Sequence, residues 1–132
     1  MILVDTSVIV AWLDPNHPDH LMCSNALENC SAVEDLAVSC ITFAELAGGG
    51  RTREALEEDL RGFLRLELDF DAAFRAGQAF RRTYPAKQEK SLVLPDFLIR
   101  AQAAVIGVGH LTNDRRRLSA FPEVEFLFPS KR

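Results

Sequence analysis

Short apolar segments alternate along this chain with longer segments of helical periodicity, and this alternation narrows the folds that it can adopt. Residues 2–5 are typical of a short buried strand, and a helix is expected to follow from Thr6 or Ser7 to Leu13. Further strands are predicted at residues 36–40, 66–70, 109–112 and 124–128. Because strands that alternate with helices form parallel sheets, we predict an α/β protein: a three-layer α/β/α sandwich around a central, mostly parallel sheet.

The predicted helices have recognisable start and stop signals. They are expected to begin at residues 16–18, at Thr42, at residue 52, after an N-cap at Asp71, at Pro95 and at Asp114. The glycines at residues 48–50 end the helix from Thr42, and the helix from residue 52 is expected to continue to Leu66. The polar segment 85–91, which contains Lys87 and Lys90, is typical of a mobile loop.

Length and composition agree with an ordinary globular protein. The 132 residues fit one domain that spans residues 1–132. No segment approaches the ~18 consecutive apolar residues of a membrane span, and the N-terminus lacks the basic region of a signal peptide. We therefore expect a cytoplasmic protein without a membrane partner. Trp12 and the phenylalanines lie on apolar faces of the predicted elements and are expected in the core.

Three cysteines, Cys23, Cys30 and Cys40, are predicted to be small buried residues without a disulfide. Cys23 and Cys30 lie seven positions apart in one predicted helix, which places them about 10 Å apart. A disulfide requires Cα atoms within about 7 Å. His17 and His20 lack a third ligand at the spacing of a zinc site, so we expect both at the surface or at a helix start.

Four acidic residues follow apolar segments of the chain. They are Asp5 after residues 2–4, Glu45 after residues 41–44, Asp96 after residues 92–95 and Asp114 after residues 110–113. In open α/β sheets, ligands bind at the carboxyl ends of the strands. Carboxylates that gather there repel one another unless a divalent cation neutralises them. The pattern therefore predicts a Mg²⁺ site and chemistry on phosphate.

Three of these carboxylates also have structural explanations. Thr42 and Glu45 have the spacing of a capping box. Asp96 lies in the first turn of a predicted helix, with Arg100 four residues later as a possible ion-pair partner. Asp114 could be the N-cap of the helix that follows it. These alternatives stay open at the level of sequence.

Asp5 is harder to explain structurally. It ends an apolar strand, where burial of an unpaired carboxylate is costly, and no Lys or Arg lies next to it in the sequence. A metal ion would satisfy all four carboxylates together. The net charge of −4, from 19 acidic and 15 basic residues, does not exclude a nucleic-acid partner, because residues 115–117 are three arginines directly beside Asp114.

Four short motifs contain these carboxylates in a fixed order. They are residues 2–9 (ILVDTSVI), 42–46 (TFAEL), 94–99 (LPDFLI) and 111–114 (LTND). The set resembles the motifs of PIN-domain ribonucleases, specifically the VapC-type toxins of type II toxin–antitoxin systems, from residue 1 to about residue 128. One departure follows the last motif, where residues 115–118 intervene before the aromatic residue Phe121.

The resemblance implies a PIN-like fold and a metal-dependent endoribonuclease that hydrolyses RNA phosphodiesters with a metal-activated water. The catalytic and metal-binding residues would be Asp5, Glu45, Asp96 and Asp114, with Mg²⁺ or Mn²⁺ as cofactor. Supporting roles in orienting these carboxylates would fall to Thr6, Ser7 and Thr112, and contacts with the RNA backbone to Arg115 and Arg116. The implied partners are RNA, a cognate antitoxin protein and a second copy of the chain in a homodimer.

Two other classes of protein are alternatives to a PIN-domain ribonuclease. A phosphoacceptor signalling domain would have adjacent acidic residues after its first strand and a late Lys, and neither is present beside Asp5 or Asp114. A catalytically inactive PIN-like module that only binds RNA or protein is the second alternative. The four acidic positions favour the active enzyme.

Overall fold

Five parallel strands form the centre of the computed structural model, which describes residues 1–86 and 90–130. Their order across the sheet is β3-β2-β1-β4-β5, and every neighbouring pair is parallel. The strands are β1 (Ile2–Val4), β2 (Leu36–Ser39), β3 (Leu64–Leu66), β4 (Gly109–Leu111) and β5 (Phe126–Leu127). Lys87, one of the two lysines of the predicted loop, lies outside the described residues.

The central strand β1 is apolar along its whole length because helices cover both faces of the sheet. Ile2 and Val4 belong to one hydrophobic core, whereas Leu3 belongs to a second core on the opposite face. Leu3 is paired in register with Ala37 of β2 and with His110 of β4. The alternation of side chains along each strand therefore divides the apolar residues between two cores.

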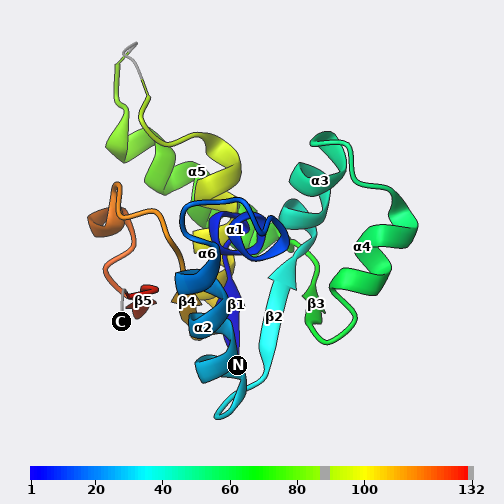
Figure 1. Cartoon of the computed structure of the whole chain (residues 1–132). Helices are drawn as coiled ribbons and strands as arrows, with labels where there is room; N and C mark the ends of the chain where they lie inside the picture. The colour runs from blue at the N-terminus through cyan, green and yellow to red at the C-terminus, as the bar shows by residue number, and fades with distance from the viewer. Residues whose placement is uncertain (87–89, 131–132) are drawn as a thin grey trace.

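Helices form the two outer layers. They are α1 (Thr6–Leu13), α2 (His20–Ser31), α3 (Cys40–Gly48), α4 (Arg53–Asp59), α5 (Phe70–Thr83) and α6 (Leu94–Ile106), with the short 3₁₀ helix η1 (Leu118–Ala120). Residues of α1, α2 and α4 pack in the first core, and α5 and α6 pack together in the second. In Figure 1, α1 and α2 lie in front of the sheet and α6 behind it. The predicted α/β/α sandwich with a parallel central sheet is confirmed.

The prediction for residues 52–70 is wrong in its boundaries. The helix ends at Asp59 instead of Leu66, and the strand lies at Leu64–Leu66 instead of residues 66–70. Pairing with β2 decides this position, since Leu64 and Leu66 lie opposite Ala37 and Ser39. An isolated apolar pattern is compatible with both registers, but the neighbouring strand accepts only one of them.

Helix α5 has a different cap from the predicted one. The carboxylate of Asp69 accepts a hydrogen bond from the backbone N–H of Ala72 at 2.8 Å, so the helix begins at Phe70. Asp71, the predicted cap, lies inside the first turn instead. Asp69 has the extended backbone that an N-cap requires.

Two other predicted helix starts are corrected. Helix α3 begins at Cys40, where Ser39 caps the N–H of Ile41 at 3.0 Å, and Thr42 is buried inside the helix. The helix predicted from Asp114 is reduced to η1, because Arg117 adopts a left-handed backbone with φ of 56° that interrupts any helix before it. The last strand is likewise shorter than the predicted residues 124–128.

Some residues expected in the core lie at the surface. Phe70 and Phe74 are 93% and 70% exposed, since both lie on the outer face of α5. All three cysteines are free, as predicted, but only Cys23 is fully buried and Cys40 is exposed. No helix within residues 1–86 and 90–130 has the length and apolar character needed to cross a membrane.

Candidate functional site

The carboxyl ends of the two central strands bring the first and last acidic motifs together. Asp5 directly follows β1, and its N–H donates to the carbonyl oxygen of Leu111, the last residue of β4, at 2.8 Å. Thr112 and Asp114 follow β4 on the same edge. Because β1 and β4 are parallel neighbours, their carboxyl ends lie side by side although more than a hundred residues separate them along the chain.

Asp5 is buried and held by three hydrogen bonds to one of its oxygens. Its Oδ2 accepts from the Ser7 N–H at 3.2 Å, from the Ser7 hydroxyl at 2.5 Å and from the Thr112 hydroxyl at 3.1 Å. Asp5 is also the N-cap of α1. Two of the predicted supporting residues, Ser7 and Thr112, therefore orient this carboxylate, which leaves Oδ1 for another ligand.

Glu45 comes to the site from the middle of α3. Its Oε1 accepts a hydrogen bond from the Thr6 hydroxyl at 2.7 Å, and the hydroxyls of Thr6 and Thr42 lie 2.8 Å apart. The capping-box explanation of Glu45 is therefore wrong, because Glu45 binds a side chain of α1 and Ser39 caps α3. Thr6, the third predicted supporting residue, links α1 to α3.

Asp96 has a structural role in addition to its place in the site. Its Oδ2 accepts from the backbone N–H of Val93 at 3.1 Å, which caps the start of α6. The expected ion pair with Arg100 is absent from the described residues. Arg100 is buried and donates instead to the backbone carbonyls of Asp114, at 3.0 Å, and Arg116, at 2.6 Å. Arg100 thus holds the turn that presents Asp114.

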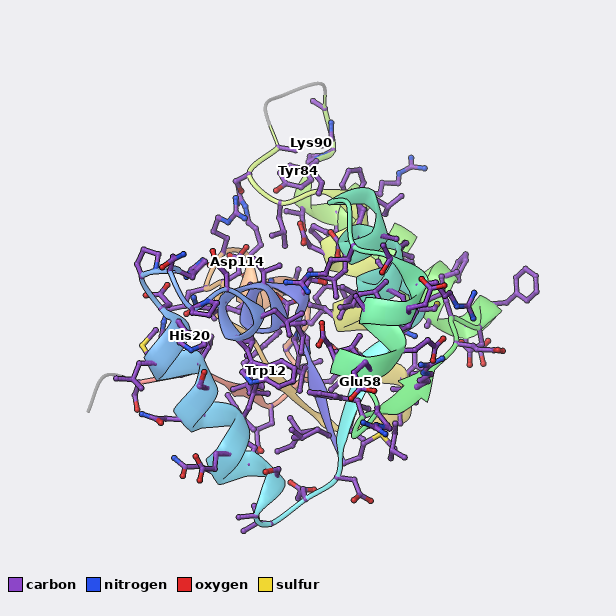
Figure 2. The ribbon with its side chains drawn as sticks, turned by 45° about the vertical axis from the view of Figure 1, so that its right-hand side comes forward. Trp12, His20, Glu58, Tyr84, Lys90 and Asp114 are labelled. Atoms are coloured by element: carbon purple, nitrogen blue, oxygen red, sulfur yellow. The ribbon has the colours of Figure 1, made fainter. Side chains whose placement is uncertain are left out.

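Asp114 forms a close ion pair with one of the two predicted RNA-binding arginines. Its carboxylate accepts from the Arg116 guanidinium through Nε at 2.9 Å and Nη2 at 2.6 Å, and from the Arg116 N–H at 3.0 Å. The other, Arg115, lies with its guanidinium 3.9 Å from the ring centroid of Phe128. In Figure 2, Asp114 lies below Tyr84 and Lys90 and above Trp12.

The acidic residues change one another's pKa. Burial raises the pKa of Glu45, and the charges of Asp96 and Asp5 raise it further against the Thr6 hydrogen bond. Burial also raises the pKa of Asp96, where the charges of Asp5 and Asp114 act in the same direction. Asp5, Glu45, Asp96 and Asp114, which come from four separate segments, therefore lie near enough to one another for their charges to interact.

Asp114 behaves differently from the other two. Burial works to raise its pKa, but the hydrogen bonds and charge of Arg116 together hold that pKa below its ordinary value. Asp114 is therefore the most readily ionised of these groups, and its negative charge is already compensated by an arginine. Glu45 and Asp96 have no such partner among the described residues.

The donor set suits a hard divalent cation. Carboxylate and hydroxyl oxygens are the ligands that Mg²⁺ prefers, and mutual repulsion between the carboxylates is what a cation would relieve. Within residues 1–86 and 90–130, however, no three acidic, His or Cys side chains converge closely enough to form a ready-made metal cage. The residues fit the chemistry of Mg²⁺, and their side chains would have to close around it.

Sequence reasoning missed His110, which is fully buried in β4. Its Nδ1–H donates to the carbonyl oxygen of Leu3 at 2.9 Å, and its Nε2 lies 3.7 Å from Asp5 Oδ1. Burial lowers the pKa of His110, so the ring is neutral near pH 7. A titratable residue inside a strand predicted to be buried is the signal that could have identified it.

The fold and this acidic edge define a PIN domain. The family model described as PIN domain matches residues 2–127, and the chain belongs to that family. No curated protein matches it in sequence.

Among solved structures, the chain is similar to a toxin-antitoxin complex from Klebsiella pneumoniae, at 23% identity with 99% of each chain covered and a TM-score of 0.73. It is similar to FitAcB from Neisseria gonorrhoeae, at 25% identity with 98% of each chain covered and a TM-score of 0.72. VapC20 from Mycobacterium tuberculosis, a sarcin-ricin loop cleaving toxin, is similar at 18% identity with 95% and 99% covered and a TM-score of 0.64.

Proposed function

We propose that this protein is a Mg²⁺- or Mn²⁺-dependent endoribonuclease and the toxin of a toxin–antitoxin pair. The observation that carries the proposal is that Asp5, Glu45, Asp96 and Asp114, from four separate segments, interact through their charges, and that the pKa values of Glu45 and Asp96 are raised by burial and by the neighbouring carboxylates. Such a group of perturbed carboxylates is typical of a functional site. Membership of the PIN domain family and similarity in fold to VapC20, a sarcin-ricin loop cleaving toxin, support the same proposal.

In this proposal Asp5, Glu45, Asp96 and Asp114 would hold the cation, which would supply Lewis-acid activation of water and neutralise charge on the attacked phosphate. Ser7 and Thr112 keep the carboxylate of Asp5 in one orientation through their hydrogen bonds to Oδ2. Thr6 does the same for Glu45. A fixed orientation matters because loose ligands reduce both affinity and rate.

Arg116 has two partners in this scheme. Its guanidinium binds Asp114 in the structure, so Asp114 becomes available to a cation when Arg116 moves to another anion. The phosphate of an RNA chain is such an anion, and the arginine fork can bind it through two hydrogen bonds. Arg115 is the second candidate for a backbone contact because its side chain is exposed.

The deciding experiment compares RNA cleavage by the wild type and by Asp5→Asn with Mg²⁺ and with EDTA. We expect metal-dependent cleavage by the wild type and a loss of at least about 100-fold in the variant. The control is Asp35→Asn, an exposed carboxylate that precedes β2 at the opposite edge of the sheet. Wild-type activity in Asp5→Asn would refute the mechanism, and a wild type that binds RNA without cutting it would favour the inactive module.

A cognate antitoxin and a homodimer complete the proposal. Similar folds occur in a toxin-antitoxin complex from Klebsiella pneumoniae and in VapBC2 from Rickettsia felis, which was crystallised on a DNA fragment from its promoter. Exposed apolar side chains such as Leu21, Val33, Phe70 and Phe74 offer surface for such contacts.

A further inference from the structure

A groove lined by arginines opens between α5 and the segment that follows Asp114. It has a volume of about 430 Å³. Among the described residues, its lining includes three arginines, Arg75, Arg82 and Arg117, and no acidic residue. This concentration of positive charge contrasts with the net charge of −4 of the whole chain. We call these three residues and the space between them the arginine groove.

Arg75 lines the arginine groove and is held in place by contacts with other residues of the protein. Its guanidinium lies 4.6 Å from the ring centroid of Phe121 and donates to the carbonyl oxygen of Ala120 at 3.1 Å. The same group is paired with Glu123 at 2.9 Å and is only 19% exposed. Arg75 therefore serves mainly to hold the segment before β5 against α5, and its charge is partly compensated.

Arg82 and Arg117 are the charges that face solvent. Arg82 is exposed in the last turn of α5, and Arg117 is exposed before η1. Within residues 1–86 and 90–130, neither of them forms an ion pair with a carboxylate. Two guanidinium groups without an ion-pair partner in the described part of the chain attract an anion to the groove and can donate hydrogen bonds to it.

Arg117 also has a strained backbone conformation. In the described part of the chain it is the only non-glycine residue with a positive φ, at 56°. Its guanidinium lies 5.4 Å from the ring centroid of Tyr84, and its Nε donates to the Ser91 hydroxyl at 3.3 Å. Strained residues of this kind persist where the surrounding structure fixes them, often at binding sites.

The arginine groove is linked to Asp114 through the neighbouring residues Arg116 and Arg117. Arg116 binds Asp114 on one side, and the next residue, Arg117, lines the groove on the other. Both arginines donate to Ser91: Arg116 to its backbone carbonyl oxygen and Arg117 to its hydroxyl oxygen. These contacts place Arg116, the partner of Asp114, next to an arginine of the groove.

We propose that the arginine groove binds the phosphate backbone of the RNA next to the cleaved phosphodiester. This inference rests on the proposed ribonuclease function and adds Arg82 and Arg117 as residues that position the substrate. RNA fits better than an acidic peptide, because phosphates are regularly spaced along one chain and can occupy the acidic site and the groove together. Arginine forks also match the geometry of phosphate oxygens.

The test measures RNA binding separately from cleavage. A fluorescein-labelled single-stranded RNA is titrated with Asp5→Asn protein in Mg²⁺, and the same protein with Arg82→Ala and Arg117→Ala added is compared with it. We expect Kd to rise about tenfold in the groove variant. The slope of log K against log salt should become shallower by about 1.4, because each lost phosphate contact on a single strand contributes about 0.7.

The matched control is Arg53→Ala with Arg61→Ala in the same Asp5→Asn background. These two exposed arginines lie on and just after α4, outside the arginine groove, and their loss changes the net charge by the same amount. The control should bind RNA as its parent does. Arg82→Ala alone, on an exposed helix face, serves as a second groove variant in which the strained backbone of Arg117 is untouched.

Each outcome has one meaning. Equal loss of RNA affinity in the groove and control variants overturns the proposal, since bulk charge would then explain it. Unchanged RNA affinity in the groove variant also overturns the proposal. If polyglutamate, titrated in the same way, binds this variant more weakly than its parent, the groove is assigned to an acidic protein partner. Because binding is read without cleavage, a wild type that fails to cut RNA would refute the ribonuclease proposal while leaving a positive groove result in place.

Discussion

The hydroxyl side chains around Asp5 show how single residues shape the acidic site. Ser7 and Thr112 both donate to Asp5 Oδ2, and the Thr112 hydroxyl in turn accepts from the N–H of Asp114. Thr112 is fully buried, so its hydrogen bond to Asp5 is protected from water. One threonine thus connects the carboxylate after β1 with the carboxylate after β4.

Glu45→Gln tests the repulsion between the carboxylates. The pKa of Glu45 is raised, so between the ordinary pKa of Glu, about 4.3, and the folded value, the native state binds more protons than the unfolded state. The free energy of unfolding therefore falls as pH rises through that window. Gln keeps an acceptor for Thr6 without the charge. We expect the variant to melt at a higher temperature than the wild type at pH 7 in EDTA.

The pH dependence of this gain is its control. At pH 4, Glu45 is mostly protonated in both states, so the difference between variant and wild type should be clearly smaller than at pH 7. Thermal unfolding followed by circular dichroism across this range gives the result. A gain of equal size at pH 4 and pH 7, or a loss at pH 7, would argue against carboxylate repulsion.

At the level of elements, caps place the helices that deliver the acidic residues. Ser39 starts α3 so that Glu45 lies beside Thr6, and Asp96 itself caps α6. Arg100 of α6 then holds the backbone of the turn after β4. The site therefore depends on where α3 and α6 begin as much as on the identity of the carboxylates.

The start of α5 offers a direct comparison of two neighbouring aspartates. Asp69→Ala removes the hydrogen bond to the Ala72 N–H and should lower the free energy of unfolding by about 1 kcal/mol. Asp71→Ala removes only a first-turn charge and should cost about 0.3–1 kcal/mol, screened by salt. Urea denaturation in high salt separates the two. A larger loss in Asp71→Ala than in Asp69→Ala would identify Asp71 as the N-cap of α5.

At the scale of the whole molecule, the acidic site lies near the arginine groove. The chain as a whole has a net charge of −4. Asp114 and Arg116 form the junction between the two regions. Because a protein of this charge repels RNA elsewhere on its surface, local arginines would guide the substrate to the carboxylates.

Expression of the whole protein in bacteria tests the toxin proposal. We expect induction of the wild type alone to slow bacterial growth, because it would cut cellular RNA, and Asp5→Asn to be harmless at the same protein level. Co-expression of the product of an adjacent gene should restore growth. Equal growth of wild-type and Asp5→Asn cultures would count against a toxin, even if the purified protein cuts RNA.

The local patterns of the sequence were sufficient for the fold class and for the candidate acidic positions. Apolar segments that alternate with helical periodicity predicted the parallel sheet, and Asp5 and Asp114 follow β1 and β4 as the pattern indicated. The apolar segments before Glu45 and Asp96 are not strands, because these two residues lie within α3 and α6. Boundaries were less accurate at residues 52–71, since apolar spacing is compatible with several registers and two aspartates could each cap α5. Those errors did not move the acidic site, because β3 lies at the edge of the sheet.

By itself, the sequence determined the layered parallel fold and the positions of Asp5 and Asp114 after the neighbouring parallel strands β1 and β4, because both follow from short-range patterns and the direction of parallel strands. Only the tertiary structure decided the partners of these groups. Packing between elements decides that Glu45 binds Thr6, and it places His110 beside Asp5. The ion pair of Asp114 with Arg116 also forms only in the folded turn after β4. The arginine groove likewise arises from contact between α5 and residues 117–122, which no local pattern encodes.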